Sequence, residues 1–460
     1  MLTALAAGAL LAAAPGAAVA ASRPAITQVT CLRACVGAKT VAPGGLVRLR
    51  GERFSRGMRA AFKVAGGARH TFPTGVRSRR MARVTVPQGT VAGPFYVRDR
   101  AGRRSNAVKP LRIAAPAVAR TPKPAPAAAP ATATGTAFDG NGMWIWYVSR
   151  TAGGDPAAIV AQAKAHGVST VFVKSADGTT AWSQFSAPLV AALKAGGLDV
   201  CAWQYVYGTR PDLEAQVAAQ TIAAGGADCF VIDAETEYQG RYAQAQRYVT
   251  ALRAALGDSY PIGFTSFPYV DYHPSLPYSV FLGPGGAQFN APQIYWKAIG
   301  GGVDAVVDHT YQHNRPYARP IVPLGQLYDG PSTADVLRFR QLLAQAGATG
   351  VSWWDWQHAE SRHWDAIGQP LVPLALPVLS PDMVTLKSGM TGDLVIWAQQ
   401  HLNGAGYPIT VNGRYDATMT QTITAYQAGM GLSQTGQIDT LTWQALLRSP
   451  AAVVDWAAQR

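Results

Sequence analysis

The sequence predicts a multidomain protein built around a (β/α)8 barrel, with a small β-sandwich before the barrel and a small helical module after it. Residues 142–370 alternate strand-like apolar runs with helical stretches, which is the order of elements in a parallel barrel. Residues 24–113 show short alternating runs between Gly and Pro turns, which is typical of a sandwich. Residues 384–448 contain helical stretches around a turn. A chain of 460 residues is long enough for two to four such domains.

Eight strands are predicted for the central domain, which we place at residues 138–370. They cover residues 143–148, 169–174, 199–205, 229–233, 261–266, 288–295, 320–327 and 350–355. Helices are predicted between most of them, at residues 155–166, 211–224, 240–256 and 333–346. The segment 267–286 is rich in Pro, Tyr and Gly and is predicted to be a long loop. In such a barrel the active site lies at the carboxyl ends of the strands.

The fourth predicted strand ends in two carboxylates. Cys229 to Ile232 is an apolar run without Gly or Pro, and Asp233 and Glu235 follow it. Because strand side chains alternate between two faces, these two point the same way with Cβ atoms about 6.6 Å apart, a working distance for acid/base chemistry. Asp-x-Glu at a strand end is also compatible with a solvated exit or a helix N-cap. Glu237 is either a reserve acid or a surface glutamate.

Polar and aromatic side chains gather at the carboxyl ends of the other predicted strands. Aromatic rings stack on the apolar faces of pyranoses, while carboxylates and amides bind hydroxyls, so this set is typical of a sugar site. Each aromatic taken alone is more often part of a core. The substrate-binding candidates are Lys174, Trp203, Tyr205, Gln293, Tyr295, Asp355 and Gln357. Lys174 and Asp355 are also expected to tune the carboxylate pair.

The N-terminus and one internal segment have compositions unlike those of folded domains. Residues 1–20 lack charged side chains and end in Ala18-Val19-Ala20, which is typical of a cleaved secretory signal peptide. We therefore expect a secreted mature chain without a transmembrane segment. Residues 114–137 are rich in Ala, Pro and Thr and are predicted to be an extended linker, so that the domains on either side move independently.

Four cysteines fit an extracellular location. Cys31 and Cys35 lie close together in a Gly- and Pro-rich region, and a disulfide between them would close a small loop. Cys201 and Cys229 begin neighbouring predicted strands, where a buried thiol pair and a disulfide are both compatible with the sequence. Neither pair has the spacing of a zinc site.

The positive charge is concentrated in the first domain. Residues 31–113 hold 19 Lys and Arg against two acidic residues, whereas the whole chain carries +14. This charge either serves solubility or binds a polyanion such as an anionic wall polymer, an acidic polysaccharide or a membrane surface. Nucleic acid fits a secreted protein poorly.

Three motifs relate this first domain to a known family. Gly44 to Phe54, Val84 to Pro87 and Gly102 to Asn106 resemble an IPT/TIG immunoglobulin-like domain. The resemblance covers about 90 residues and implies an Ig-like β-sandwich that serves as an interaction or spacer module.

A proline-rich connector at residues 371–383 leads to the last module, residues 384–448. Its residues alone predict a small amphipathic helical bundle, and they do not specify which partner it binds. Leu386 to Leu402, Val411 to Asp416 and Thr418 to Ala428 closely resemble the three-helix peptidoglycan-binding domain found on many wall hydrolases. The resemblance implies a small C-terminal three-helix domain that binds peptidoglycan at the cell wall.

The barrel resembles the lysozymes of glycoside hydrolase family 25. The similarity lies in Val171 to Gly178 at the second strand and in Val231 to Glu235 at the fourth. It implies that Glu235 is the general acid and that Asp233 stabilises or attacks the oxocarbenium-like centre. That family usually has an aspartate on its first strand, whereas this chain has Trp144 and Trp146 there and an aspartate, Asp139, only before the strand.

Other catalytic schemes find little support. There is no Gly-x-Ser-x-Gly or His-Glu-x-x-His motif. His309 and His313 are one helical turn apart but have no Glu between them, and we expect them on an outer helix face. No metal site and no cofactor are predicted.

Two functional hypotheses follow from these observations. The first is a lysozyme- or muramidase-like hydrolase of a wall glycan that uses Asp233 and Glu235. The second is a non-catalytic wall-binding protein whose barrel holds glycan without cutting it. The intact carboxylate pair favours the first hypothesis, and the missing first-strand aspartate favours the second.

Overall fold

The computed structural model describes residues 23–35, 40–63, 69–87, 90–91, 95–106, 112–113 and 135–458. The chain divides into two compact units, residues 1–127 and 128–460. The predicted signal peptide and residues 114–134 of the predicted linker lie outside the described residues.

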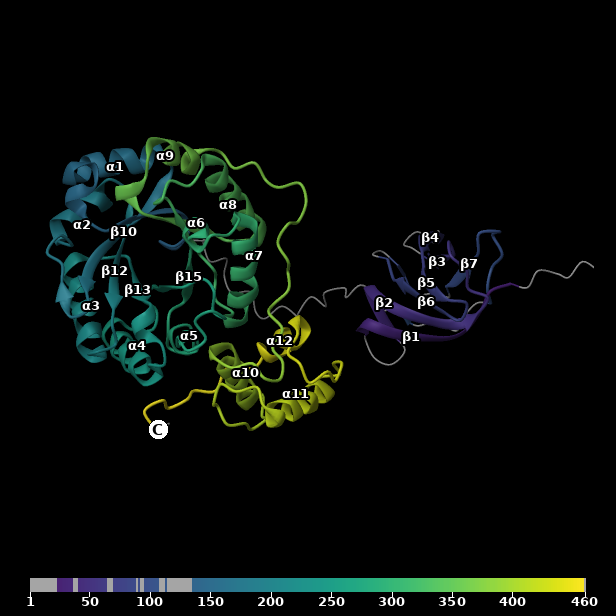
Figure 1. Cartoon of the computed structure of the whole chain (residues 1–460). Coiled ribbons are helices and arrows are strands. Elements are labelled where there is room, and N and C mark those ends of the chain that lie inside the picture. Colours follow the sequence, from purple (N-terminus) through teal and green to yellow (C-terminus); the bar gives the residue numbers. More distant parts are fainter. Residues whose placement is uncertain are drawn as a thin grey trace, which may run out of the picture. The chain divides into compact units, whose positions relative to one another are not determined.

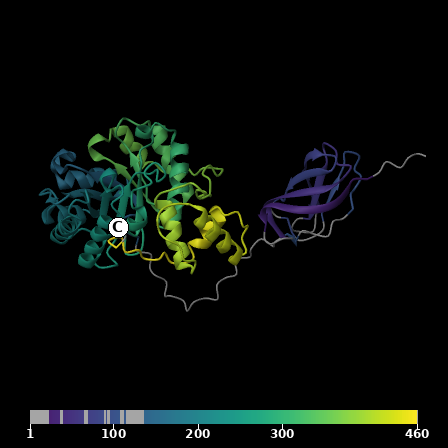
Figure 2. The ribbon, with the colours of Figure 1, turned by 60° about the horizontal axis from the view of Figure 1, so that its bottom comes forward.

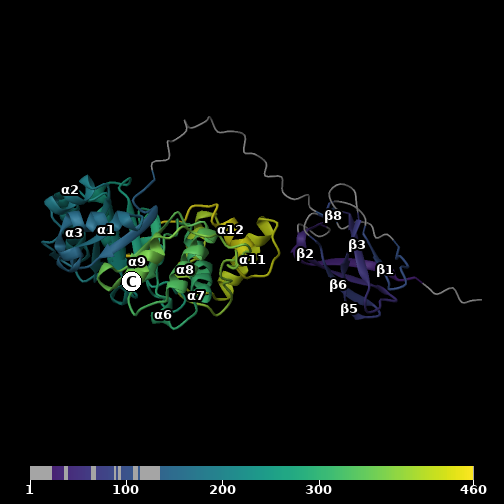
Figure 3. The same ribbon diagram turned by 90° about the horizontal axis from the view of Figure 1, so that it is seen from above.

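The described part of the N-terminal unit is a sandwich of two mostly antiparallel sheets (Figure 3). Its strands are β1 (Ala25–Cys35), β2 (Thr40–Glu52), β3 (Arg59–Lys63), β4 (Arg69–Pro73), β5 (Gly75–Ser78), β6 (Met81–Thr85), β7 (Tyr96–Arg98) and β8 (Arg112–Ile113). One sheet has the order β1-β2-β6-β5, with β8 parallel to β2, and the other has the order β4-β3-β7. Alternate residues such as Val47, Leu49 and Val84 fill the space between the sheets. The predicted β-sandwich is confirmed.

The second unit contains the predicted barrel (Figure 1). Within residues 135–458, all of which are described, eight parallel strands pair in sequence order, and the last pairs with the first. The strands are β9 (Gly140–Ile145), β10 (Val168–Asp177), β12 (Asp199–Val206), β13 (Cys229–Ala234), β14 (Ile262–Ser266), β15 (Phe289–Ile294), β16 (Leu324–Gln326) and β17 (Gly350–Trp354). A short strand, β11 (Thr180–Ala181), folds back on β10. The (β/α)8 barrel is confirmed.

Helices cover the outside of the barrel (Figure 1). They are α1 (Pro156–Ala165), α2 (Ala187–Ala195), α3 (Pro211–Gly225), α4 (Tyr242–Leu256), α5 (Tyr278–Phe281), α6 (Trp296–Ile299), α7 (Val303–Asn314), α8 (Thr333–Ala346) and α9 (Ser361–Gly368). Local sequence starts several of them: the side chains of Asp155, Ser186 and Ser332 accept hydrogen bonds from backbone N–H groups of the first turns of α1, α2 and α8. The segment predicted to be a long loop, 267–286, is mostly loop and contains only the four-residue α5.

Strand alternation creates two cores. One face of each strand packs against the helices, as Phe230 and Ile232 of β13 do. The other face fills the barrel, where Val231 packs with Trp144 and Trp203. Alternate side chains of a strand share a face, and Val231 lies inside the barrel. The side chains of Asp233 and Glu235, two and four residues later, therefore also point toward the barrel axis.

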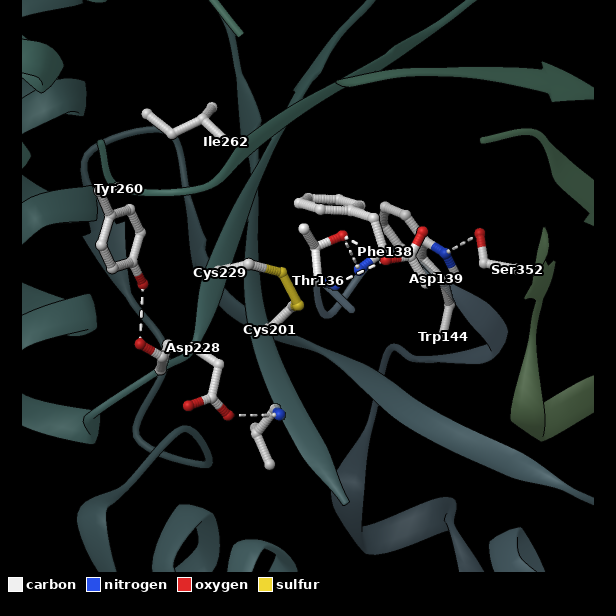
Figure 4. Close-up of a disulfide and its surroundings, with 12 residues drawn as sticks. Thr136, Phe138, Asp139, Trp144, Cys201, Asp228, Cys229, Tyr260, Ile262 and Ser352 are labelled. Carbon is white, nitrogen blue, oxygen red and sulfur yellow. Dashed lines mark hydrogen bonds between the residues drawn. A yellow bond between two sulfur atoms is a disulfide. The ribbon is translucent and has the colours of Figure 1, made fainter. Parts of the chain in front are cut away.

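A disulfide closes the amino end of the barrel interior (Figure 4). Cys201 of β12 and Cys229 of β13 are register partners with Cα atoms 4.5 Å apart, and their sulfurs are bonded. Phe138, in the turn before β9, lies in the same inner core. The sequence left a buried thiol pair and a disulfide both open for these two cysteines, and the structure shows the disulfide. The predicted Cys31–Cys35 pair involves the side chain of Cys35, which lies outside the described residues.

The C-terminal helices form a small bundle that packs on the barrel wall (Figure 2). In the described range 384–458 the α-helices are α10 (Asp393–Gly404), α11 (Ala417–Gly429) and α12 (Thr440–Leu446). Their apolar faces bury Leu402, Ile423 and Trp443. The indole N–H of Trp397 donates to the backbone carbonyl of Pro316 at 2.7 Å, so the bundle and the barrel share one compact unit. Among the described residues of the chain, no helix is long and apolar enough to cross a membrane.

Candidate active site

The two carboxylates of the β13 segment face the inside of the barrel, two and four residues after Val231. Asp233 is 6% exposed and Glu235 is partly buried. Gln293 of β15 donates its amide N–H₂ to Asp233 Oδ1 at 3.3 Å and to Glu235 Oε1 at 2.9 Å. One amide from two strands away therefore holds both carboxyl groups in place.

The pKa values of both carboxyl groups are raised. Burial raises the pKa of Asp233 well above its usual range, and the charge of Glu235 raises it further, while Lys174 opposes the shift. Burial also raises the pKa of Glu235, although hydrogen bonds from Gln293 and Asp233 lower it. Two neighbouring carboxyl groups with raised pKa values hold protons to a higher pH than free carboxyl groups do, and they titrate as a coupled pair.

A buried lysine lies near this pair. Lys174 is 4% exposed, and its Nζ contacts Asp177 Oδ2 at 2.6 Å. The ammonium group lies 4.6 Å from the ring centre of Trp182 and 4.7 Å from that of Trp203. Tyr207 donates its hydroxyl to Asp177 Oδ1 at 2.7 Å, and this bond raises the pKa of Tyr207 to about 12.

Two tyrosines contribute hydroxyl groups near the carboxylates. Tyr205 donates to Glu237 Oε2 at 2.7 Å, so Glu237 is tied to the rim and is not a free surface glutamate. Burial and neighbouring carboxylates raise the pKa of Tyr205 and of Tyr295. Both phenols therefore remain protonated at neutral pH.

Two of the predicted substrate-binding residues have structural roles. Trp203 is 1% exposed and donates its indole N–H to a backbone carbonyl of β9 at 3.3 Å, so it forms the floor beneath the site. Gln357 accepts from the backbone N–H of Trp146 at 3.2 Å and donates to the Tyr147 carbonyl and to the Thr151 hydroxyl. Its amide thus holds the end of the first strand and is already occupied.

Asp355 is a buried carboxylate whose charge acts on Tyr295. It follows β17, is 0% exposed, and its Oδ1 contacts His358 Nδ1 at 2.5 Å. Burial raises the pKa of Asp355, and the hydrogen bond from His358 opposes the shift. Its charge in turn contributes to the raised pKa of Tyr295. Of the two groups expected to tune the pair, Lys174 acts on Asp233 directly, whereas Asp355 acts on this neighbouring phenol.

Asp177 is a site residue that sequence reasoning missed. Lys174 and Asp177 are three residues apart, so a regular strand would direct them to opposite faces. The register with β12 shifts between Lys174 and Ala176, and this irregularity brings the two side chains together. The available signal was the polar run from Lys174 to Asp177 at a strand end, but the bulge itself has no mark in the sequence.

The first strand brings tryptophan, and no carboxylate, to the carboxyl end of the barrel. Trp146 follows β9, and its ring centre is 5.9 Å from that of Trp354 and its ring lies 5.7 Å from Lys174 Nζ. Asp139 precedes β9 and accepts hydrogen bonds from Thr136, beside the disulfide and at the opposite end of the strands (Figure 4). Asp139 therefore lies at the end of the barrel opposite the Asp233 and Glu235 pair.

Candidate metal ligands come together elsewhere. Among the residues that the structure describes, one set of His, Cys, Asp or Glu side chains is close enough to share an ion, namely Asp271, His309 and His313. This set includes neither carboxylate of the β13 pair.

Comparison with known proteins identifies the C-terminal bundle. Residues 391–446 match the family described as "Putative peptidoglycan binding domain". This range contains α10, α11 and α12. No curated protein matches the chain.

Solved structures that resemble the chain are glycan-degrading enzymes at low similarity. A GH18 chitinase from Pseudoalteromonas aurantia is 10% identical with a TM-score of 0.38, covering 49% of this chain and 97% of that one. A chitinase from Chromobacterium violaceum is 13% identical with a TM-score of 0.40, covering 50% and 98%. The Bacillus cereus spore cortex-lytic enzyme SleL is 11% identical with a TM-score of 0.40, covering 50% and 73%. Similarity of this degree does not bear on substrate or mechanism.

Proposed function

We propose that this protein is a secreted, wall-associated glycoside hydrolase that cleaves a glycan of peptidoglycan in a lysozyme- or muramidase-like reaction. The observation that carries the proposal is the buried pair Asp233 and Glu235, which shares the Gln293 donor, has raised pKa values and faces inward at the carboxyl end of the fourth barrel strand. Glycoside hydrolysis needs a carboxylic acid that keeps its proton until it meets the glycosidic oxygen.

Glu235 is the member of the pair that reaches substrate. It is less buried than Asp233 and lies two residues further along the chain toward the rim. The raised pKa of Glu235 lets this carboxyl group keep a proton, and in the proposed step it gives that proton to the leaving oxygen. Water then attacks the sugar and returns a proton to the pair.

Two carboxylates near Glu235 are proposed to stabilise the positive charge that develops on the sugar. Asp233 shares the Gln293 donor with Glu235, and Glu237 accepts a hydrogen bond from the Tyr205 hydroxyl at 2.7 Å.

The rim supplies surfaces for binding sugar. Trp182 and Tyr147 line one hollow, and their ring centres are 5.4 Å apart. Partly exposed rings of this kind stack on the apolar faces of pyranoses. Among the predicted binding groups, the Gln293 amide contacts both carboxylates, and the Tyr295 hydroxyl is close enough for their charges to raise its pKa.

Two other regions would direct the enzyme to the wall. The C-terminal bundle is proposed to bind peptidoglycan, on the basis of its family match. In the N-terminal unit, Arg104 lies 3.7 Å from the ring centre of Tyr96, and Arg69 and Arg98 lie 5.4 and 5.5 Å from it. This exposed cluster is proposed to bind anionic wall polymers. Arg98→Gln combined with Arg104→Gln should weaken binding of a purified anionic polymer at low salt more than at high salt.

A second candidate function is glycan binding without cleavage. The observation that favours it is Trp146, which stands where a first-strand aspartate was expected and packs near Trp354 and Lys174. Aromatic surface in place of a carboxylate strengthens sugar binding without adding chemistry.

Release of reducing ends from purified peptidoglycan separates the two functions. The full chain is compared with Glu235→Gln and with the matched control Glu360→Gln, an exposed glutamate paired with Arg362. Loss of release in Glu235→Gln alone, with all three proteins still sedimenting with the wall, supports the hydrolase. No release from any of them, with sedimentation retained, supports the binding protein.

A further inference from the structure

Two histidines and an aspartate meet on the outer wall of the barrel. His309 and His313 lie one turn apart on α7, and their rings stack with centres 4.2 Å apart and planes at 15°. Asp271 belongs to the loop between β14 and α5 and reaches both rings. Its Oδ1 lies 2.8 Å from His309 Nε2, and its Oδ2 lies 3.7 Å from His313 Nε2. The three possible ligand atoms lie within 4.8 Å of one another.

In the neutral His313 ring, the tautomer places the lone pair of Nε2 opposite a carboxylate oxygen of Asp271. Its Nδ1 lies 2.9 Å from the His309 backbone carbonyl, which can only accept, so Nδ1 carries the hydrogen. In the neutral ring Nε2 then holds a lone pair, and this lone pair faces a carboxylate oxygen of Asp271. His313 is buried, with 8% of its surface exposed. A cation between the two atoms resolves this repulsion.

We propose that Asp271, His309 and His313 bind one divalent transition-metal ion, for which Zn²⁺ is the best match. Two imidazoles and one carboxylate are a ligand set that Zn²⁺ accepts, whereas Ca²⁺ and Mg²⁺ prefer oxygen ligands alone. Ligand distances of about 2.0–2.2 Å require a modest approach of the three side chains. Asp271 and His309 are each 30% exposed, so both can adjust and water can occupy the fourth position.

The ion would brace the surface on which the C-terminal bundle docks. It would join the β14–α5 loop to α7, and the same loop contacts the bundle, because the Pro274 carbonyl accepts from the Asp393 backbone N–H at 2.7 Å. Binding to the folded state stabilises it by an amount that grows with the logarithm of the ion concentration divided by Kd. This role is independent of the proposed glycan chemistry.

Zn²⁺ binding to the untagged full chain, stripped of metal with a chelator, tests the site by calorimetry. We expect one equivalent of Zn²⁺ to bind and the melting temperature to rise. Co²⁺ should give the visible absorption of a site with mixed nitrogen and oxygen ligands.

Asp271→Asn is the decisive variant because this exposed side chain leaves the barrel core untouched. It should weaken binding by at least about tenfold, as removal of a direct ligand does. The matched control is His273→Gln, two residues away on the same loop, whose ring stacks on Phe267 outside the cluster. Circular dichroism confirms that both variants fold. Unchanged affinity in Asp271→Asn, or no saturable binding by the wild type, overturns the proposal and leaves an Asp–His ion pair only.

Discussion

Asp393 joins the C-terminal bundle to the barrel, and replacing it with alanine or with asparagine should have very different effects. The carboxylate is 1% exposed. Its Oδ1 accepts from the Ser279 backbone N–H at 2.8 Å and from the Tyr317 hydroxyl at 2.7 Å, and its Oδ2 accepts from the Ser279 hydroxyl at 2.7 Å. Alanine leaves these three buried donors without partners. Each lost hydrogen bond of this kind costs about 1 kcal/mol or more.

Asparagine preserves the network. Its Oδ1 keeps the two bonds of the carboxylate Oδ1, and its N–H₂ group meets the Ser279 hydroxyl, which can rotate to accept. We therefore expect the free energy of unfolding of Asp393→Ala to be about 3 kcal/mol below that of Asp393→Asn.

The free energy of unfolding of the wild type, relative to those of the two variants, should change with pH. Burial raises the pKa of Asp393 from 3.8 to about 6, although hydrogen bonds from Tyr317 and Ser279 oppose the shift. A raised carboxyl pKa contributes stability that is present below pH 4 and is lost as pH rises through 6, by about 3 kcal/mol in total. The wild type should match Asp393→Asn near pH 4 and fall below it by pH 7.

Urea unfolding of the three proteins across this pH range measures both effects. Limited proteolysis within residues 371–383 reports whether the bundle has left the barrel. Equal stability of the alanine and asparagine variants, or a constant difference between wild type and asparagine from pH 4 to pH 7, would refute this account of the docking contact.

Three further predictions concern the barrel. Glu235→Gln should lower kcat by about 10²- to 10⁴-fold, the contribution of a general acid, in the reducing-end assay. Lys174→Met removes the charge that lowers the pKa of Asp233, so the alkaline limb of the kcat/KM profile should move to higher pH. Replacing Cys201 and Cys229 together with alanine opens a loop of 28 residues and should lower the free energy of unfolding by about 3 kcal/mol in urea.

Each of these has an outcome that contradicts it. Activity retained in Glu235→Gln but lost in Glu237→Gln would move the acid role to Glu237. An alkaline limb that stays in place in Lys174→Met would mean that the lysine charge does not act on the pKa of Asp233. Equal stability of oxidised wild type and the cysteine variant, with the reduced wild type as control, would contradict the bridge.

Much of the architecture could be predicted because it follows from short-range periodicity. Side chains from Cys229 to Glu235 alternate between the two faces of a strand, so the sequence alone places Val231, Asp233 and Glu235 on one face. Alternating runs and helical stretches likewise predicted the β-sandwich, the eight parallel strands and the C-terminal helices. These patterns depend on residues only a few positions apart, so the sequence by itself determined the fold class and the direction of the carboxylate pair.

Contacts between distant segments were decided only by the tertiary structure. The bulge after Lys174 brings Asp177 to it, closure of the strands makes Gln293 a shared donor, and loop packing carries Asp271 to α7. Asp393 likewise finds its donors on α5 and near Pro316. Which side chains meet across tens or hundreds of residues depends on strand register, loop path and helix packing together. No local period encodes these, and the hydrogen-bond partners that set each pKa are therefore known only once the chain has folded.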